Sequence, residues 1–186
     1  MNFKINKEEM LYILNELLRT KNMSTCAAKK VACVLYSRRP VDGELVPYMA
    51  SGYNKSVSSC QCNTQFQKID GQWFFLNKNK EWKHDDTGLK HKLWSVTHEV
   101  HAEIMALTEF SDEKPYEEKL AVVTWSPCLD CCKSLINANV KTILYQYEFD
   151  NFEEIKELCK ECNVDLCRFE VKNGVCYIDD IPLEEA

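Results

Sequence analysis

Apolar and polar residues follow a helical period in the first part of the chain. From residue 6 to residue 20, apolar residues recur every three or four positions, which is the spacing of one helix face. Asn6 and Glu9 stand three residues apart at the start of this stretch, as in a capping box. The pattern predicts a helix that packs one face against the rest of the protein.

Two strands are expected next. Residues 31–36 form a short continuous apolar run, which is typical of a strand buried on both faces. Residues 38–43 supply a turn, and 45–53 indicate a second strand. Pro47 lies inside that strand and cannot donate a hydrogen bond to a neighbour. We therefore expect a hairpin whose second strand is at the edge of a sheet.

The pattern changes in residues 55–95, which are mostly polar and show no long period. A plain loop of this length would be unusual, so we expect an insertion with its own role or a metal staple. Trp73, Phe74 and Phe75 are expected to pack as a small satellite core. We expect one domain over residues 1–186 that carries this insertion.

The second half of the chain alternates between helical and strand patterns. Helices are expected at 100–110, 127–138 and 152–162, and strands at 120–125, 140–145 and 164–169. Single helices between strands imply parallel neighbours joined by crossovers. Asn173-Gly174 is a turn signal, so 175–178 is expected to form a small final hairpin. The predicted fold class is α/β, a three-layer α/β/α sandwich with a mixed sheet of about five strands.

Composition and charge narrow the class of protein. The 186 residues are 45% apolar and 11% aromatic, enough to bury a sizeable core. The net charge of −6 argues against sequence-independent binding to long nucleic acid, which relies on clustered lysine and arginine. No apolar stretch resembles a signal peptide or a membrane span. The eleven cysteines are therefore expected to be reduced in the cytoplasm, some on metal and some buried.

Two motifs carry the chemistry. His101 and Glu103 form an H-x-E motif, and Pro127, Cys128 and Cys131 form P-C-x-x-C. Both fall at the starts of expected helices, where the partial positive charge favours thiolate over thiol. One imidazole and two thiols can hold zinc and leave its fourth position for water. This pair of motifs is the pattern of the zinc nucleobase deaminases.

The motifs indicate a reaction class, hydrolytic deamination of an aromatic amine. We expect Glu103 to take a proton from the water and pass it to the ring nitrogen and the leaving ammonia. The alternative is a structural zinc staple, which usually has a fourth protein ligand. Cys132 is the obvious spare thiol, but it points about 100° around the helix from Cys131 and is expected in the core.

Cysteine and histidine residues also gather in and beside the insertion. They are Cys60, Cys62, His84, His91 and His98. A second metal would explain how a segment without a regular pattern is held. The alternative is that these are scattered, solvated loop residues.

The sequence resembles the deoxycytidylate (dCMP) deaminases, particularly their phage branch, over most of the chain from about Cys26 to Phe169. The elements that carry the resemblance are Lys30-Val31-Ala32-Cys33-Val34, Ser51-Gly52-Tyr53-Asn54, Glu99-Val100-His101-Ala102-Glu103 and Thr124-Trp125-Ser126-Pro127-Cys128-Leu129-Asp130-Cys131. The Gly-Tyr-Asn element distinguishes the dCMP deaminases from other zinc deaminases, because the metal motifs are shared by all of them. The resemblance implies a cytidine deaminase-like fold and conversion of dCMP to dUMP and ammonia, which supplies dUMP for dTMP synthesis.

The resemblance also implies substrate contacts. Asn54 would contact the deoxyribose hydroxyl, and the backbone of Ala102 and Ser126 would contact the pyrimidine. Tyr145 would lie near the sugar-phosphate, and Lys30 is the candidate for the phosphate. The family forms homo-oligomers, so a homo-oligomer is expected.

Phage members of this family carry a second, structural zinc. By resemblance, its ligands here would be Cys26, either Cys60 or Cys62, His91 and Glu99. The segment from Glu99 to Glu103 would then serve two metals.

Three features depart from the family pattern. Residues 55–59 are not glycine-rich, and Ala32 replaces a strand glycine. Residues 111–118 are acidic where effector-responsive members tend to carry an arginine. This last departure weakens the case for dCTP and dTTP as effectors and for the hexamer that supports their action.

The same motifs also allow other substrates and one other class of protein. The substrate is expected to be dCMP or a 5-modified dCMP. His101 to Leu107 looks like tRNA adenosine deaminases, and Trp125 to Cys128 looks like polynucleotide cytidine deaminases. The acidic charge and the Gly-Tyr-Asn element weigh against a polynucleotide. A catalytically silent, zinc-stapled nucleotide-binding protein is the alternative of another class, and the intact Glu103 argues against it.

Overall fold

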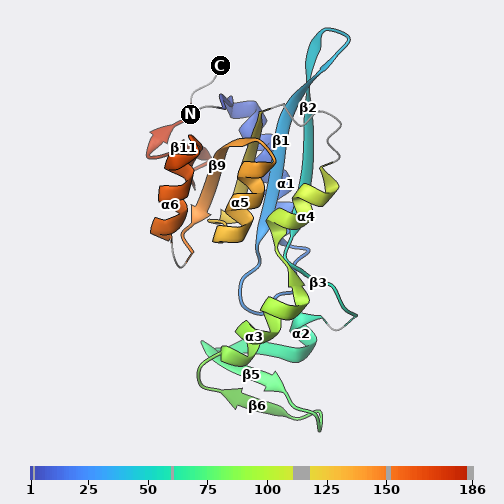
Figure 1. The fold of residues 1–186 in the computed structure, drawn as a ribbon. Helices are drawn as coiled ribbons and strands as arrows, with labels where there is room; N and C mark the ends of the chain where they lie inside the picture. Colours follow the sequence, from blue (N-terminus) through green and yellow to red (C-terminus); the bar gives the residue numbers. More distant parts are fainter. Residues whose placement is uncertain (2, 60, 111–117, 150–151, 184–186) are drawn as a thin grey trace.

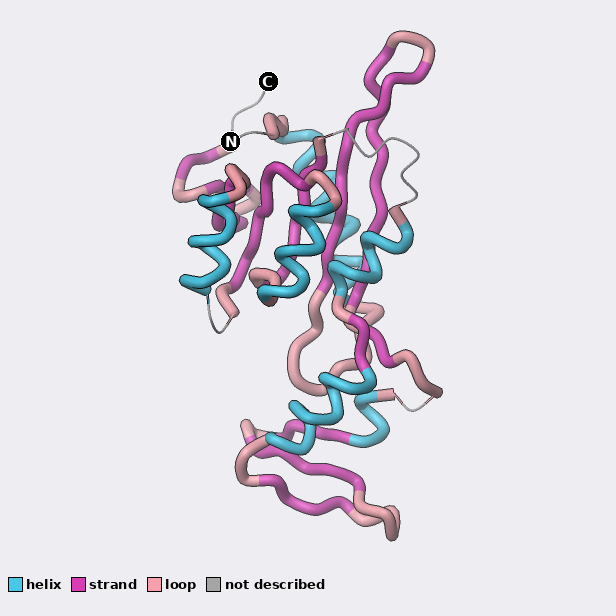
Figure 2. The backbone as a smooth tube through the Cα atoms, in the orientation of Figure 1, coloured by secondary structure: helices cyan, strands magenta, loops and turns pink. Residues whose placement is uncertain are grey.

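The structure is a computed structural model that describes residues 1, 3–59, 61–110, 118–149 and 152–183. Its largest element is a seven-stranded sheet (Figures 1 and 2). In spatial order the strands are β12 (Ile181–Pro182), β11 (Val175–Ile178), β10 (Asp165–Lys172), β9 (Val140–Tyr147), β8 (Lys119–Trp125), β1 (Ala32–Val41) and β2 (Glu44–Tyr53). Strands β8, β9 and β10 are parallel, as predicted, and β1 is antiparallel to both of its neighbours.

Helices cover both faces of this sheet and complete the predicted α/β/α sandwich. They are α1 (Lys7–Lys21) on one face, and α4 (Ala102–Glu109), α5 (Leu129–Asn137) and α6 (Phe152–Glu161) on the other. Strand β1 shows why two layers form. Val34 and Tyr36 pack in the cluster with α1, whereas Cys33 and Leu35 pack in the cluster with α4, α5 and α6. All four side chains are fully buried.

Two predictions about the sheet have different outcomes. The hairpin with its second strand outermost is confirmed, because β2 pairs only with β1 and forms the sheet edge in the described chain. The prediction of about five strands is too low. Asn173 and Gly174 both adopt positive φ and turn the chain back after β10. As a result β11 pairs antiparallel with β10, and β12 with β11, which extends the sheet.

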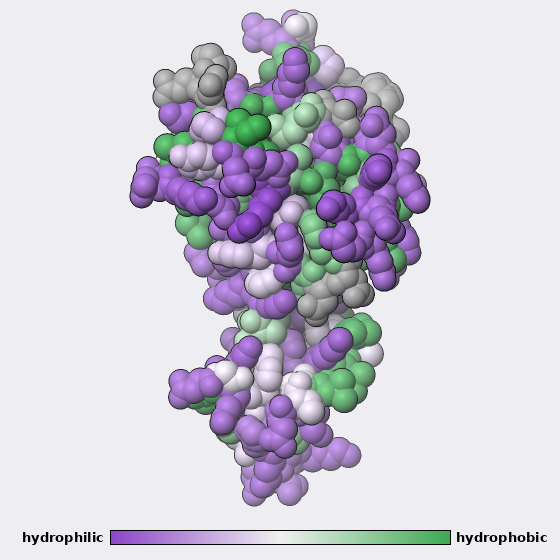
Figure 3. Space-filling view, turned by 90° about the vertical axis from the view of Figure 1, so that its left-hand side faces the viewer, coloured by the Kyte–Doolittle hydropathy of each residue, from purple (hydrophilic) through white to green (hydrophobic). Residues whose placement is uncertain are grey.

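The inserted segment forms a small lobe below the main body, joined to it by a narrower waist (Figures 1 and 3). Its elements are β3 (Lys55–Ser56), α2 (Cys62–Gln65), β4 (Phe66–Ile69), β5 (Gln72–Leu76), β6 (Trp82–Asp85), α3 (Leu89–His98) and β7 (Glu99–Val100). Strands β4, β5 and β6 form a three-stranded sheet, and β3 pairs with β7. The strands of this sheet are short and largely part-exposed, so the sequence shows no long period there.

A satellite core lies inside the lobe. Trp73 and Phe75 pack against buried Cys26, Cys62 and Phe66, in agreement with the sequence prediction. The Phe74 ring, by contrast, contacts the His84 ring in an edge-to-face arrangement. This small core cannot bury much apolar surface, so it depends on additional contacts for its stability.

Helix α1 is fixed to the sheet by one carboxylate. The predicted capping box is present, because Asn6 Oδ1 accepts from the Glu9 backbone N–H at 2.8 Å and Asn6 N–H donates to Glu9 Oε2 at 3.1 Å. Tyr36 Oη and Arg38 Nε also donate to Glu9 Oε1, at 2.6 and 2.7 Å. Burial opposes the charge, but these hydrogen bonds lower the pKa of Glu9 to about 2.

We predict that Glu9→Gln destabilises the protein by about 1–3 kcal/mol at pH 7. The pKa of Glu9 is depressed in the folded state, so its contribution is present above the unfolded value of 4.5 and lost as pH falls toward 2. Urea unfolding of wild type and variant at several pH values should show a difference that shrinks with acidity. Exposed Glu8, in the same helical turn, provides the control Glu8→Gln. An equal effect of both variants would contradict the role of Glu9 in fixing α1 to the sheet.

Helix α4 lies unusually close to β2, and Gly52 makes this possible. A Cβ atom at Gly52 would lie 2.3 Å from the Ala102 carbonyl oxygen and 2.4 Å from the Ala106 nitrogen. Both are backbone atoms of α4, so no side-chain rotation could relieve the clash. The glycine of the Gly-Tyr-Asn element therefore sets the distance between α4 and the sheet.

We predict that Gly52→Ala destabilises the protein by roughly 1–3 kcal/mol or more, because α4 must move outward. Gly43→Ala is the matched control. Nothing lies within 4 Å of its added Cβ, and only the strain of φ +89° would be felt. Urea unfolding measures both. A Gly52→Ala variant as stable as Gly43→Ala would show that α4 is not held at this distance.

Candidate functional site

The three metal-type ligands of the motifs come together at two helix starts. His101 is the N-cap residue of α4, Cys128 is the N-cap residue of α5, and Cys131 lies in the first turn of α5. His101 Nδ1 lies 3.4 Å from Cys128 Sγ and 3.3 Å from Cys131 Sγ. The sequence therefore placed these side chains correctly, with one shift: α5 begins at Leu129, so Pro127 precedes the helix.

The charges of this cluster suit a bound cation. The Cys131 thiol donates a hydrogen bond that, together with His101, lowers the pKa of Cys128 to about 4. The pKa of Cys131 is raised in turn, because its proton is shared with Cys128. The pKa of His101 is raised, chiefly by the hydrogen bond to Cys128. One thiolate is thus already favoured, and a metal ion would favour the second.

The distances fit zinc. Tetrahedral zinc with ordinary Zn–S and Zn–N bonds separates its nitrogen and sulfur ligands by roughly 3.5 Å. The three ligand atoms of this cluster lie within 4.8 Å of one another. Cys132 does not complete the set, because it is fully buried and its sulfur lies 3.5 Å from that of Cys159 on α6. Within the described residues, this cluster offers three ligand atoms, one fewer than tetrahedral zinc takes, so a bound zinc would keep one position for water.

Glu103 lies beside this cluster and follows Ala102 in the first turn of α4. Its side chain is only 3% exposed, and its carboxyl group hydrogen-bonds with the Cys131 thiol. Burial raises the pKa of Glu103, although nearby His101 opposes this effect. A carboxylate with a raised pKa is suited to accept a proton and later to give it up.

Ser126 and Ala102 line the same region from two sides. Ala102 is fully buried at the start of α4, and Ser126 is 2% exposed at the end of β8. The Ser126 side chain accepts a hydrogen bond from Phe149 N–H at 2.8 Å, and Ser126 N–H donates to the Tyr147 carbonyl at 2.7 Å. The loop that carries the P-C-x-x-C motif is thereby tied to the end of β9.

Asn54 holds the loop that precedes β1. Its Oδ1 accepts from Ser24 Oγ at 2.6 Å and from Val31 N–H at 2.9 Å. Its Nδ2 donates to the Lys29 carbonyl at 3.0 Å. The amide oxygen is thus occupied, and one of the two amide hydrogens remains for a ligand. Ser24 is a functional neighbour that the sequence did not reveal, since a single serine carries no motif.

The last two substrate residues suggested by the sequence have different surroundings. Tyr145 is 6% exposed and its ring packs 5.0 Å from that of Phe152. Burial raises its pKa to about 12. Lys30 is exposed. Tyr145 therefore belongs to the core as well as to the end of β9, whereas Lys30 lies at the surface.

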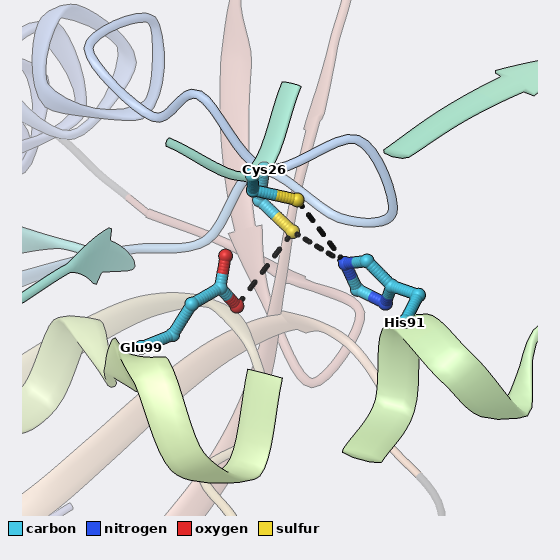
Figure 4. A group of neighbouring side chains, drawn as sticks. Cys26, His91 and Glu99 are labelled. Carbon is cyan, nitrogen blue, oxygen red and sulfur yellow. Dashed lines mark hydrogen bonds between the residues drawn. The ribbon is translucent and has the colours of Figure 1, made fainter. Parts of the chain in front are cut away.

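A second cluster joins the lobe to the main body. It consists of Cys26, Cys62, His91 and Glu99, whose ligand atoms all lie within 4.8 Å of one another. His91 Nε2 lies 3.2 Å from Cys62 Sγ and 3.7 Å from Cys26 Sγ, and Cys26 Sγ lies 3.9 Å from Glu99 Oε2. Figure 4 shows Cys26, His91 and Glu99 pointing toward one another; His91 lies in α3, Glu99 caps the end of that helix, and Cys26 comes from the loop before β1. Cys60, the alternative ligand, lies outside the described residues.

This second cluster is also charged and enclosed. A hydrogen bond from Cys62 lowers the pKa of Cys26 to about 3, and the same bond raises the pKa of Cys62. Burial raises the pKa of Glu99. The Trp73 ring stacks on His91 at 4.6 Å. Four ligands with tetrahedral-type spacing and no open position are typical of a structural zinc site.

Comparisons with known proteins agree with the fold and with a zinc-binding region. A profile of the cytidine and deoxycytidylate deaminase zinc-binding region matches residues 6–147. ComE operon protein 2 of Bacillus subtilis is 33% identical over 66 residues, which is 35% of this chain and 35% of that protein. The chain thus aligns with about a third of the length of that relative. No helix in the described chain is long and apolar enough to cross a membrane.

Solved structures share the fold. The dCMP deaminase of cyanophage S-TIM5, in complex with dCMP and dUMP, matches with a TM-score of 0.57 and 18% identity, over 89% of this chain and 99% of that chain. Its apo form matches with a TM-score of 0.54 and 19% identity, over 88% and 99%. The match of the family profile spans well over half of the sequence and includes both metal motifs. The chain therefore belongs to the cytidine and deoxycytidylate deaminase family.

Proposed function

We propose that this protein is a zinc-dependent hydrolase that converts dCMP and water to dUMP and ammonia, and so supplies dUMP for dTMP synthesis in the cytoplasm. The observation that carries the proposal is buried Glu103 beside a three-ligand cluster with an open position. Membership of the deaminase family supports the reaction class. The S-TIM5 enzyme of the same fold binds dCMP and dUMP, which favours this substrate.

The chain supplies ligands and proton transfer. Zinc held by His101, Cys128 and Cys131 would supply an acidified water at its open position. Glu103 accepts a proton from that water and delivers it to the pyrimidine ring nitrogen. The oxygen of the water would form a bond to the ring carbon that carries the amino group and become the carbonyl oxygen of dUMP. The second proton of the water would pass through Glu103 to the amino group, whose bond to that carbon breaks as ammonia leaves. The raised pKa of Glu103 favours both halves of this transfer.

Substrate contacts follow from the surroundings of the cluster. Ala102 and Ser126 flank the place of the pyrimidine with backbone groups. Asn54 offers its remaining amide hydrogen to the deoxyribose hydroxyl, and its hydrogen bonds to Ser24 and Val31 hold it in place. Tyr145, near the end of β9, is proposed to lie near the sugar and phosphate of the substrate. Its ring packs in the core and would support that part of the site.

The second cluster is proposed to bind a structural zinc through Cys26, Cys62, His91 and Glu99. The satellite core of the lobe is small, so a metal would add the stability that burial does not provide. Cys62 is preferred to Cys60 because the residue is 1% exposed and its sulfur lies 3.2 Å from His91 Nε2. Glu99 and His101 then fix the two ends of one short segment.

We also propose a homo-oligomer. Leu89, Leu93 and Val96 are spaced four and three residues apart on α3 and are 52%, 61% and 76% exposed. Figure 3 shows hydrophobic residues gathered on one side of the lobe. Such a stripe is suited to packing against a second copy. Residues 111–117, where effector-responsive relatives differ, lie outside the described residues, and dCTP and dTTP are not proposed as effectors.

We predict that Glu103→Gln lowers the rate of dCMP deamination at least 100-fold and keeps the zinc. The amide has the shape of the carboxylate but cannot accept and release the proton. Ammonia release measures the rate, and metal analysis measures the zinc. Turnover near that of wild type would remove Glu103 from the mechanism.

The same assay tests the substrate. Wild-type protein should deaminate dCMP and leave cytosine in single-stranded DNA and adenosine in tRNA unchanged. The opposite preference would overturn the proposed function. Zinc-loaded protein that released ammonia from none of these compounds would favour a silent binding protein.

For the second metal, wild-type protein is predicted to hold about two zinc ions per chain and Cys62→Ser about one. The variant should also unfold at lower urea concentration, because the lobe loses its staple. Cys60→Ser, two residues away, is the matched control and should retain both ions. Two ions in Cys62→Ser, or one in Cys60→Ser, would contradict the proposed ligand set.

A further inference from the structure

Lys29 stands out because, among the described residues, aromatic rings and no carboxylate contact its ammonium group. Its Nζ lies 3.9 Å from the centre of the Trp125 ring and 4.4 Å from that of Phe149. In the part of the chain that the structure describes, Lys29 forms no ion pair. Ring faces attract a cation but do not neutralise it. In a chain of net charge −6, a cation held by rings and without a carboxylate partner in the described part of the chain is unusual.

The two rings belong to the loops that carry the proposed active site. Trp125 immediately precedes Ser126 at the end of β8, and Phe149 N–H donates to the Ser126 side chain at 2.8 Å. Trp125 also packs 5.2 Å from Tyr147 at the end of β9. The ammonium group of Lys29 is therefore positioned next to the loop that leads into the metal-binding P-C-x-x-C motif.

The backbone of Lys29 is tied to the other side of the same site. Its carbonyl oxygen accepts the hydrogen bond from Asn54 Nδ2 at 3.0 Å. Asn54 is the residue proposed for the deoxyribose hydroxyl. Lys29 thus contacts the residue proposed for the sugar through its backbone and the loop before the P-C-x-x-C motif through its side chain. The 5′-phosphate of a nucleotide is attached to that sugar, so a nucleotide bound through Asn54 would carry its phosphate on this side of the site.

On this basis we infer that Lys29 binds the 5′-phosphate of the substrate and makes the enzyme select a nucleoside monophosphate over a nucleoside. The inference rests on the proposed function and deepens it. A lysine binds phosphate as a point charge, and a phosphate monoester carries close to two negative charges at neutral pH. The two rings hold the long side chain in one place, so less rotamer freedom is lost when the phosphate binds.

This assignment differs from the one suggested by the sequence. Lys30 is exposed, and it makes no contact with an aromatic ring or carboxylate in the described chain. Lys29 and Lys30 are adjacent and chemically identical, so sequence reasoning could not separate them. The contacts with Trp125 and Phe149 do so.

The test compares kcat/KM for dCMP and for deoxycytidine in Lys29→Met, Lys29→Arg and Lys30→Met. Lys29→Met keeps an unbranched side chain against the rings but removes the charge. It should lower kcat/KM for dCMP roughly 10- to 100-fold, mainly through KM, and leave deoxycytidine within about twofold of wild type. Lys29→Arg should restore most of the preference for dCMP, and Lys30→Met should change neither substrate.

Equal losses on both substrates in Lys29→Met would show a structural role and overturn the inference. So would an unchanged ratio, or a loss of dCMP preference in Lys30→Met. These failures leave the proposed function intact, because wild-type turnover of dCMP tests that function separately. Wild-type protein that prefers deoxycytidine to dCMP would overturn both.

Discussion

The close approach of α4 to β2 at Gly52 is the constraint on which the site depends. It fixes the height of the α4 N-terminus above the sheet, and His101, Ala102 and Glu103 all belong to that N-terminus. Helix α5 begins just after β8 and brings Cys128 and Cys131 to the His101 imidazole. Because both helices start at the metal cluster, their partial positive ends face the thiols and favour thiolate. Packing and electrostatics therefore act on the same few atoms.

The segment from Glu99 to Glu103 links two clusters that differ in kind. Glu99 belongs to a largely buried cluster of four residues that could hold a metal, in which Trp73 stacks on His91. His101 belongs to a cluster of three such residues beside Glu103. The pairing of β3 with β7 holds the backbone between them, since Lys55 pairs with Val100. A displacement of the lobe would therefore be transmitted to His101 over two residues. The lobe and the site are therefore joined through one short backbone segment.

Much of this could be predicted from the sequence, because short-range patterns determined it. The H-x-E and P-C-x-x-C spacings fix which side chains leave a helix start together, and they led to His101, Cys128, Cys131 and Glu103. The fold class followed from strands separated by single helices. The final strands were undercounted because β12 has only two residues and no pattern of its own. Strands β4 to β6 were missed because most of their side chains are part-exposed and show no alternation. Ser24 and the contacts of Lys29 depend on loops that meet only in three dimensions.

The central claim is that a zinc ion with an open position lies beside Glu103 and acts on a pyrimidine nucleotide. Diffraction at the zinc absorption edge from crystals grown with dUMP tests it most directly. We predict an anomalous peak bonded to His101, Cys128 and Cys131, with the pyrimidine of dUMP between that peak and Glu103. A peak closed by a fourth protein ligand, or dUMP bound away from Glu103, would contradict it.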